Sequence, residues 1–313
     1  MKKDLNIVVV EPIHVEGIKI LKRYGKVIQL SSSSTEDDLL RVSGKADAFI
    51  TRGFMKISEK VFRTTERLKV IGVHGVGVDH IDIDFAQKKG IQIVRTPSAL
   101  AVTVAEFTIG LMLSLLRNIP KADLAVRKGQ WGKKYSELIG VDLTRKTVGI
   151  IGLGTIGSEV ARRLKAFNVE IVYYKRVRNH ELEKQLDVKY VSLKRLLEIV
   201  DIISIHVPLT LETHHMISTE EFALMKHGVY IINTSRGAVI EEKALYEALV
   251  SRRVAGAALD VFESEPICPD SQLIKLDRVI LTPHLAASSE EALRRMSVAV
   301  AEEVIGILVP SKT

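Results

Sequence analysis

The chain has 313 residues, enough for about two domains, and its 46% apolar and 27% charged residues exclude an intrinsically disordered or fibrous protein. Its net charge of +7 is spread along the chain and aromatic residues make up only 5%, which favours attraction of anionic ligands over nucleic-acid binding. The single cysteine, Cys268, excludes an internal disulfide framework and a cysteine-rich metal site, and it favours a cytoplasmic location.

The first hundred residues alternate short apolar runs with amphipathic stretches. The charged start passes directly into a strand-like run, without the pattern of a secretory signal. Strands are expected at 7–10, 27–30, 48–50, 70–73 and 91–94, with helices such as 15–24 and 59–65 between them. This alternation predicts a parallel sheet with helices on both faces.

An apolar stretch at 100–116 separates this region from a second one of the same kind. It is shorter than the ~20 residues that a membrane span needs, and it contains Glu106, so we interpret it as a buried or interface helix and expect no membrane contact. From residue 147 the alternation resumes. We expect strands at 147–151, 170–174, 202–206, 229–233, 255–259 and 279–281, and helices at 157–167, 193–199 and 289–308.

Proline-containing segments at Pro97 and Pro283 mark the boundaries between the two regions. They predict a discontinuous domain, 1–98 with 286–313, and a second domain, 99–285, inserted into it. The expected fold class of both is α/β.

A glycine-rich sequence, GLGTIG, directly follows the strand expected at 147–151 and precedes a helix. Gly152 would permit the tight turn, Gly154 would let the backbone approach a pyrophosphate, and Gly157 would let helix and strand pack closely. Free N–H groups at the start of the helix would then bind the phosphates of a dinucleotide.

Basic residues stand where an NAD site usually has an acid that binds the ribose 2′-hydroxyl. After the strand at 170–174 come Lys175 and Arg176. A 2′-phosphate would be attracted there, so we expect NAD or NADP as the cofactor, with NADP accepted. A solvated basic loop in an enzyme that uses NAD is the alternative.

Three residues suited to reducing a 2-keto acid each follow an expected strand: Arg236, Glu265 and His284. Carboxyl ends of strands are where open α/β sheets bind ligands. Arginine suits a substrate carboxylate, histidine suits proton transfer to the carbonyl oxygen, and a carboxylate hydrogen-bonded to the histidine would orient it.

The whole chain resembles the D-isomer-specific 2-hydroxyacid dehydrogenase family. The resemblance rests on HGVGVDHID, TVAEFTIGLML, VGIIGLGTIG, HVPLTLET, NTSRG, LDVFESEP and LTPH, in the family's order. It implies that Arg236 binds substrate, that Glu265 is the partner of the histidine, and that His284 is the acid/base. It also implies a dinucleotide-binding Rossmann domain, 99–285, inserted into a smaller flavodoxin-like substrate domain, 1–98 and 286–313. A homodimer is implied as well, with a cleft that closes over cofactor and a small-molecule 2-keto or 2-hydroxy acid.

The resemblance assigns further residues to the two ligands. Backbone groups of Val76 and Gly77 would hold the substrate carboxylate, and the neighbouring His74 is a candidate substrate contact. The remaining candidates are cofactor-binding: Thr103, Thr155, Ile156, His206, Val207, Pro208, Thr213, Thr234, Ser235, Asp260 and Ala286.

The sequence leaves several 2-keto acids as candidate substrates. Arg52 matches a phosphate-binding arginine of phosphoglycerate dehydrogenases, whereas Val73 replaces an arginine that some of them carry before the GVG loop. A D-3-phosphoglycerate dehydrogenase-like enzyme is expected first, and a glyoxylate/hydroxypyruvate reductase is the alternative. A binding protein of another class, resembling a nicotinamide-sensing corepressor, is the third, and turnover would separate it from an enzyme.

Overall fold

The computed structural model describes residues 4–310 and divides into two compact units. The first unit comprises the chain up to Leu100 together with the segment from Ser288 onward, and the second unit is Ala101–Ala287. The boundaries expected from the sequence, 98/99 and 285/286, lie close to these limits. Each unit is built on one parallel sheet, which confirms the α/β fold class.

The first unit has a five-stranded parallel sheet in the order β2-β1-β3-β4-β5, the order of flavodoxin-like folds. Its strands are β1 (Leu5–Val9), β2 (Gly25–Gln29), β3 (Ala48–Thr51), β4 (Val70–Val73) and β5 (Gln92–Arg95). Its helices are α1 (Val15–Lys22), α2 (Glu36–Ser43), α3 (Glu59–Thr64), α4 (Ile83–Lys88) and α12 (Glu290–Leu308).

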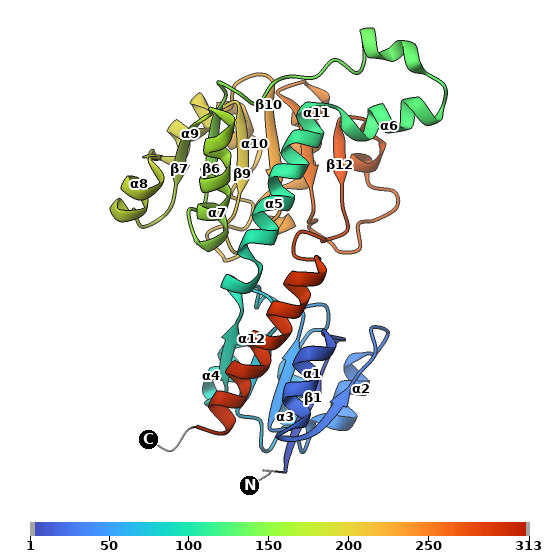
Figure 1. Ribbon diagram of the computed structural model, residues 1–313, viewed down its shortest axis with the longest axis vertical. Coiled ribbons are helices and arrows are strands. Elements are labelled where there is room, and N and C mark those ends of the chain that lie inside the picture. The colour runs from blue at the N-terminus through green and yellow to red at the C-terminus, as the bar shows by residue number, and fades with distance from the viewer. Residues whose placement is uncertain (1–3, 311–313) are drawn as a thin grey trace. The chain divides into compact units, whose positions relative to one another are not determined.

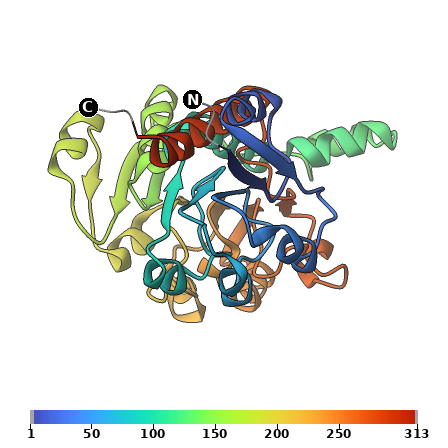
Figure 2. The ribbon, with the colours of Figure 1, turned by 90° about the horizontal axis from the view of Figure 1, so that it is seen from below.

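Helices cover both faces of this sheet, with α1 and α12 on one face and α2, α3 and α4 on the other (Figure 2). Alternate residues of β1 therefore point into two different cores. Ile7 packs in the core with α12, and Val8 packs in the core on the opposite face of the sheet, with α2, α3 and α4. The two helices α1 and α12 touch closely at a glycine. A Cβ added to Gly17 would lie only 2.4 Å from the carbonyl oxygen of Ser297.

The second unit has a seven-stranded parallel sheet in the order β12-β11-β10-β9-β6-β7-β8, a Rossmann order extended at one edge. Its strands are β6 (Thr147–Ile151), β7 (Glu170–Tyr174), β8 (Lys189–Tyr190), β9 (Ile202–Ile205), β10 (Val229–Asn233), β11 (Val254–Leu259) and β12 (Val279–Leu281). Its α-helices are α5 (Pro97–Leu116, which begins in the first unit), α6 (Ile119–Arg127), α7 (Thr155–Leu164), α8 (His180–Leu186), α9 (Leu193–Ile199), α10 (Thr219–Leu224) and α11 (Glu242–Val250). Short 3₁₀ helices are η1 (Trp131–Tyr135), η2 (Lys165–Phe167), η3 (Gly237–Val239) and η4 (Gln272–Lys275).

Helix α5 is the apolar stretch singled out in the sequence. Within residues 4–310 it is the one helix long and apolar enough to cross a membrane, and 56% of its most apolar 18-residue window is buried inside the structure. Ala105, Met112 and Leu116 of α5 pack in one core cluster with Val148 and Ile150 of β6. This is the packing of a core helix in a folded domain.

The segment after α5 forms an arm that the sequence did not predict. Helix α6 and the 3₁₀ helix η1 extend away from the sheet of their unit (Figures 1 and 2). Large apolar side chains on this arm are more than half exposed: Ile119, Leu124, Val126, Trp131, Tyr135 and Ile139. Such a set is typical of a surface that another protein covers.

Candidate active site

The glycine-rich turn after β6 has the geometry of a dinucleotide cradle. Gly152 has φ +99°, a conformation that favours glycine, and a Cβ there would lie 2.6 Å from the carbonyl oxygen of His206. A Cβ on Gly157 would lie 2.2 Å from the carbonyl oxygen of Gly152. Around Gly154, in contrast, no other atom lies within 4 Å of an added Cβ, which leaves room for a pyrophosphate.

Helix α7 begins directly after this open glycine, with Gly154 as its N-cap. Thr155 and Ile156 therefore lie in its first turn, where backbone N–H groups point out of the helix. A phosphate placed over Gly154 would meet these groups and the positive end of the helix dipole. The residues present thus fit a dinucleotide.

The basic loop after β7 includes an arginine that is bound to helix α8. Arg178 donates to both carboxylate oxygens of Glu183, each at 2.7 Å, and the hydroxyl of Tyr173 donates to the same carboxylate at 2.6 Å. The hydrogen bonds from Arg178 and then Tyr173 lower the pKa of Glu183 to about 2. Arg178 is thereby held on helix α8, and Lys175 and Arg176 lie between it and the end of β7.

Hydrogen bonds fix the segment after β9. The His206 amide donates to the carbonyl oxygen of Ile151 in β6 at 2.7 Å, and the Nε2 of His206 lies 2.8 Å from the hydroxyl of Ser204. Burial lowers the pKa of His206 to about 3, so the ring is neutral near pH 7. Further along, the hydroxyl of Thr213 donates to the carbonyl oxygen of Pro208 at 2.6 Å, which closes the loop on itself.

A tight turn after β10 carries Arg236. Asn233, the last residue of β10, donates from Nδ2 to the Arg236 carbonyl oxygen at 2.9 Å and accepts from the amide and hydroxyl of Ser235 at 3.0 and 2.8 Å. The guanidinium of Arg236 donates to the Ser235 carbonyl oxygen at 2.7 Å. Thr234 lies 2.9 Å, hydroxyl to hydroxyl, from Thr108 of α5. The signal for Asn233 in the sequence is an amide side chain at the end of a strand, a position suited to fixing a turn.

The turn of Arg236 touches the segment that carries Glu265. A Cβ on Gly237 would lie 1.8 Å from the backbone carbon of Phe262, so only glycine fits this approach. The positive charge of Arg236 helps to lower the pKa of Glu265, as expected for two segments that lie close together.

Glu265 and His284 form a hydrogen-bonded pair: Oε2 of the carboxylate lies 2.8 Å from Nδ1 of the ring. The other oxygen, Oε1, accepts from the backbone amide of Phe262 at 3.1 Å. Burial acts to raise the pKa of Glu265, but the hydrogen bond and charge of His284 outweigh it, and the pKa lies below its ordinary value. The structure therefore brings these two predicted residues together in the arrangement that orients a catalytic histidine.

Asp260, a predicted cofactor residue, holds the loop of His284. Its carboxylate accepts from the hydroxyl of Thr282 at 2.6 Å and from the amides of Leu285 and Ala286 at 2.8 Å each. Its carbonyl oxygen accepts from the amide of His284 at 2.8 Å, and His284 has φ +52°. Asp260 is fully buried, and burial raises its pKa. No pattern in the sequence assigns this role to Thr282; the sequence singles out only its neighbours Pro283 and His284.

The predicted substrate residues of the first unit lie at the carboxyl ends of β3 and β4, which are paired neighbours. Arg52 follows β3 and its side chain donates to the Pro12 carbonyl oxygen at 3.2 Å. Val76 and Gly77 lie in the turn after β4, both partly exposed.

His74, the candidate substrate contact, lies in the interior of the first unit. The side chain is buried, and Nε2 lies 3.0 Å from the hydroxyl of Ser297 on α12. Burial, and secondarily the charge of Arg52, lowers its pKa to about 4. In this structure His74 ties the turn after β4 to α12.

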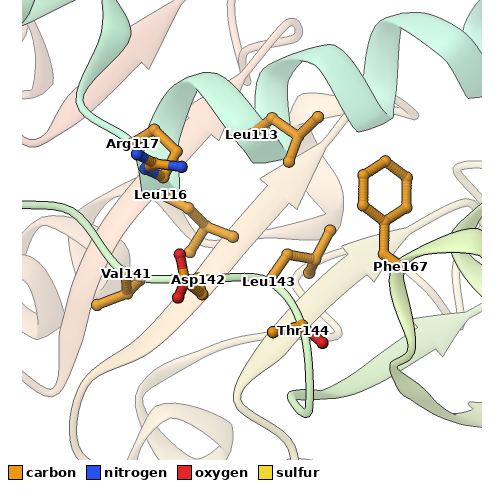
Figure 3. Close-up of a pocket in the computed structure, with 8 residues that line it drawn as sticks. All are labelled: Leu113, Leu116, Arg117, Val141, Asp142, Leu143, Thr144 and Phe167. Atoms are coloured by element: carbon orange, nitrogen blue, oxygen red, sulfur yellow. The ribbon is translucent and has the colours of Figure 1, made fainter.

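A further pocket of about 250 Å³ opens in the second unit, at the base of the arm (Figure 3). Leu113, Leu116, Val141, Leu143 and Phe167 give it an apolar lining, with Arg117, Asp142 and Thr144 at its sides. None of the predicted site residues lines it. Within residues 4–310, no group of three or more His, Cys, Asp or Glu side chains is placed to hold a metal ion.

Comparisons with known proteins agree with this geometry. Residues 109–286 match the family described as D-isomer specific 2-hydroxyacid dehydrogenase, NAD binding domain. The chain is 43% identical over 305 residues to a D-3-phosphoglycerate dehydrogenase of Methanocaldococcus jannaschii, covering 97% of this chain and 57% of the relative. The chain thus spans somewhat over half the length of that relative.

Two further similarities extend over nearly whole chains. A glyoxylate reductase of Thermofilum pendens is 43% identical over 298 residues, covering 93% of this chain and 88% of the relative. A crystal structure of a D-lactate dehydrogenase from Aquifex aeolicus, complexed with NAD and lactic acid, superposes with a TM-score of 0.84 at 34% identity, covering 96% of this chain and 95% of the other. The chain belongs to the D-isomer specific 2-hydroxyacid dehydrogenase family.

Proposed function

We propose that this protein is a nicotinamide-dependent dehydrogenase that interconverts a small 2-keto acid and its D-2-hydroxy acid. The observation that carries the proposal is the Glu265–His284 pair at 2.8 Å, beside a turn that presents Arg236. The corepressor-like alternative is not favoured, because the similar proteins bear the names of dehydrogenases and reductases.

Each residue of the pair has a separate task in this proposal. With Nδ1 bound to Glu265, the ring of His284 has Nε2 left to give a proton to the carbonyl oxygen of the keto acid. The carboxylate of Glu265 stabilises the positive charge that the ring carries before it gives up the proton. Arg236 binds the substrate carboxylate, a match of planar charged groups. When bound, the cofactor supplies the hydride.

The cofactor is held by the turn at Gly152, Gly154 and Gly157 and by the first turn of α7. We propose that NADP is accepted along with NAD, because Lys175 and Arg176 follow β7 where an acid would repel a 2′-phosphate. Arg178 is engaged by Glu183 and takes no part.

For the substrate, we favour a phosphorylated keto acid, as in D-3-phosphoglycerate dehydrogenases, because Arg52 supplies a cation in the first unit at the end of β3. Glyoxylate or hydroxypyruvate is the second candidate. The similarity to the Thermofilum glyoxylate reductase, which covers 88% of that relative, favours it.

We also propose that the protein works as a homodimer in the cytoplasm. The exposed apolar side chains of the arm, among them Trp131 and Tyr135 at 66% and 77% exposure, are suited to covering by a second copy. The single cysteine, Cys268, is exposed, which suits a reducing compartment.

The test is the oxidation of NADH and NADPH, followed at 340 nm, with phosphohydroxypyruvate, hydroxypyruvate and glyoxylate. We expect turnover with at least one keto acid and its loss in His284→Asn. Phosphohydroxypyruvate reduced well above the others supports the first candidate, and faster glyoxylate or hydroxypyruvate reduction supports the second. Cofactor binding without turnover of any keto acid would contradict the proposed activity.

A further inference from the structure

A buried carboxylate organises the segment that carries Arg52. Glu11 lies just after β1, is only 5% exposed, and accepts three backbone hydrogen bonds from one short segment. Its Oε2 accepts from the amide of Arg52 at 2.8 Å, and its Oε1 accepts from the amides of Phe54 and Met55 at 3.1 and 2.7 Å. Three donors converging on one carboxylate fix the path of the backbone between them.

The side chain of Arg52 is restrained as well. Its Nη1 donates to the carbonyl oxygen of Pro12, the residue next to Glu11, at 3.2 Å, and its guanidinium carbon lies 5.8 Å from the ring centre of Phe54. Residues 11 and 12 thus hold both the backbone and the side chain of Arg52. Such restraint reduces the conformational entropy that a flexible arginine loses when it binds an anion.

The restrained arginine lies next to the turn expected to bind the substrate carboxylate. Strands β3 and β4 pair through Thr51 and Val73, and the amide of His74 donates to the carbonyl oxygen of Thr51 at 2.8 Å. Arg52 is close enough to His74 for its charge to contribute to the lowered pKa of that ring. Position 52 and the turn at 75–77 therefore lie at one edge of the sheet.

We propose that Glu11 is a positioning residue that sets Arg52 for the phosphate end of a phosphorylated 2-keto acid, and so determines the preference for phosphorylated over unphosphorylated substrates. The inference rests on the proposed function. Glu11 acts through the backbone of residues 52–55, since its oxygens are occupied there, and it does not itself touch the substrate.

The test is Glu11→Gln, which keeps the shape of the side chain. One oxygen becomes an NH₂ group, so it can no longer accept from the backbone and faces a donor instead. We expect the ratio of kcat/KM for phosphohydroxypyruvate to kcat/KM for hydroxypyruvate to fall about tenfold, mainly through a higher KM for the phosphorylated acid. Arg52→Ala should lower the same ratio by a similar factor. The double variant should show no further fall, because Glu11 acts through Arg52.

Asp47→Asn is the matched control. Asp47 is also a buried carboxylate of the first unit, and it accepts from the amide of Asn6 at 2.8 Å and pairs with Arg67. This control should lower stability without changing the substrate ratio. Where Glu11→Gln does not fold, Glu11→Asp retracts the acceptor by one methylene and should lower the ratio in the same direction.

Two results would overturn the inference: a wild-type substrate ratio in the Glu11 variant, or effects of the Glu11 and Arg52 changes that multiply in the double variant. If the wild-type protein reduces neither keto acid, the proposed function fails, and calorimetry decides the role of Glu11. With NADH present, D-3-phosphoglycerate should bind about tenfold more tightly than D-glycerate, and Glu11→Gln should abolish the difference. Equal affinities in the wild type would refute the role.

Discussion

Oε2 of Glu265 lies 2.8 Å from Nδ1 of His284, while its Oε1 is occupied by the amide of Phe262. The carboxylate is therefore fixed at both ends, and the ring that it holds is fixed in turn. The backbone of His284, at φ +52°, is held by a hydrogen bond to the carbonyl oxygen of Asp260. A ring with so few accessible orientations would lose little conformational freedom at the transition state of the proposed proton transfer.

Removing the charge of Glu265 should reduce catalysis without abolishing binding. Glu265→Gln keeps the size of the side chain but no longer stabilises a positive ring, so we expect kcat to fall about 10²-fold. KM for the keto acid should change little, because Arg236 is untouched. Steady-state kinetics at 340 nm measure both. Glu263→Gln, two residues earlier, is the control, and an equal loss there would contradict a specific role for Glu265.

The contact between the Arg236 turn and the segment of Glu265 should tolerate no side chain. A Cβ at Gly237 would meet the backbone of Phe262 at 1.8 Å, and backbone atoms cannot move aside cheaply. We expect Gly237→Ala to lower the free energy of unfolding by about 3 kcal/mol and to abolish most activity. Gly306→Ala, in α12, has nothing within 4 Å and should instead stabilise by about 0.5–1 kcal/mol. Urea unfolding measures both, and an equally stable Gly237→Ala variant would contradict the assigned contact.

The cofactor preference should depend on two of the basic residues after β7 and not on the third. We expect the double change Lys175→Ala and Arg176→Ala to lower kcat/KM for NADPH at least about tenfold relative to NADH, since a charged hydrogen bond contributes about 1.5–3 kcal/mol. Arg178→Ala should leave the NADPH/NADH ratio unchanged, because Arg178 binds Glu183. A double variant with the wild-type NADPH/NADH ratio would contradict the proposed binding of the 2′-phosphate by Lys175 and Arg176.

Acid should destabilise the protein through His74. In the folded state, burial lowers the pKa of the His74 ring from 6.5 to about 4. Between these pH values, His74 therefore binds a proton in the unfolded chain but not in the folded one. Stability attributable to His74 is therefore present above pH 6.5 and falls as the pH drops toward 4, by about 3 kcal/mol in all. His74→Gln should flatten the dependence of Tm on pH in this window. His180→Gln, whose side chain is 76% exposed, should leave the slope unchanged, and an unchanged slope in His74→Gln would refute the assignment.

The arm should determine the oligomeric state. We expect Trp131→Glu combined with Tyr135→Glu to convert a dimer into a folded monomer, because two charges would lie in the apolar surface proposed to be covered. Sedimentation velocity at several concentrations measures the conversion. Ile274→Glu places a charge on another exposed apolar position of the same unit and should leave the dimer intact. A dimer that survives the changes at 131 and 135 would move the interface elsewhere.

The parts of the fold and site that the sequence predicted are those where local chemistry allows one structure. The glycine spacing at 152, 154 and 157 dictates a turn between a strand and a helix, and the turn is found there. The expected pairing of Glu265 with His284 joins residues that follow β11 and β12, paired strands whose carboxyl ends meet at one edge of a parallel sheet. Helix α7 begins at Thr155, two residues before the start that its apolar pattern suggested.

The parts that were missed depend on contacts distant in sequence or on short elements. Helices α2, α4, α8 and α10 are not among the helices expected by range; they have six to eight residues and are stabilised by caps such as Asp82, whose carboxylate accepts from the amide of Phe85. The sequence places His74 beside the turn at 75–77 and does not indicate what its ring contacts. Only the packing of α12 shows that its ring points at Ser297, 223 residues away.

The position of α12 in the first unit has a consequence for how the chain is made. Its residues Val300, Ala301 and Val304 complete a core whose buried members outside α12, such as Ile7 and Ile50, come from the first seventy residues. On the ribosome, only α1 can cover that face of the early sheet until residues 290–308 have been synthesised. The second unit, by contrast, is continuous in sequence. All its strands are therefore synthesised before α12 can complete the core of the first unit. The last unit to finish folding is therefore the one whose synthesis begins first.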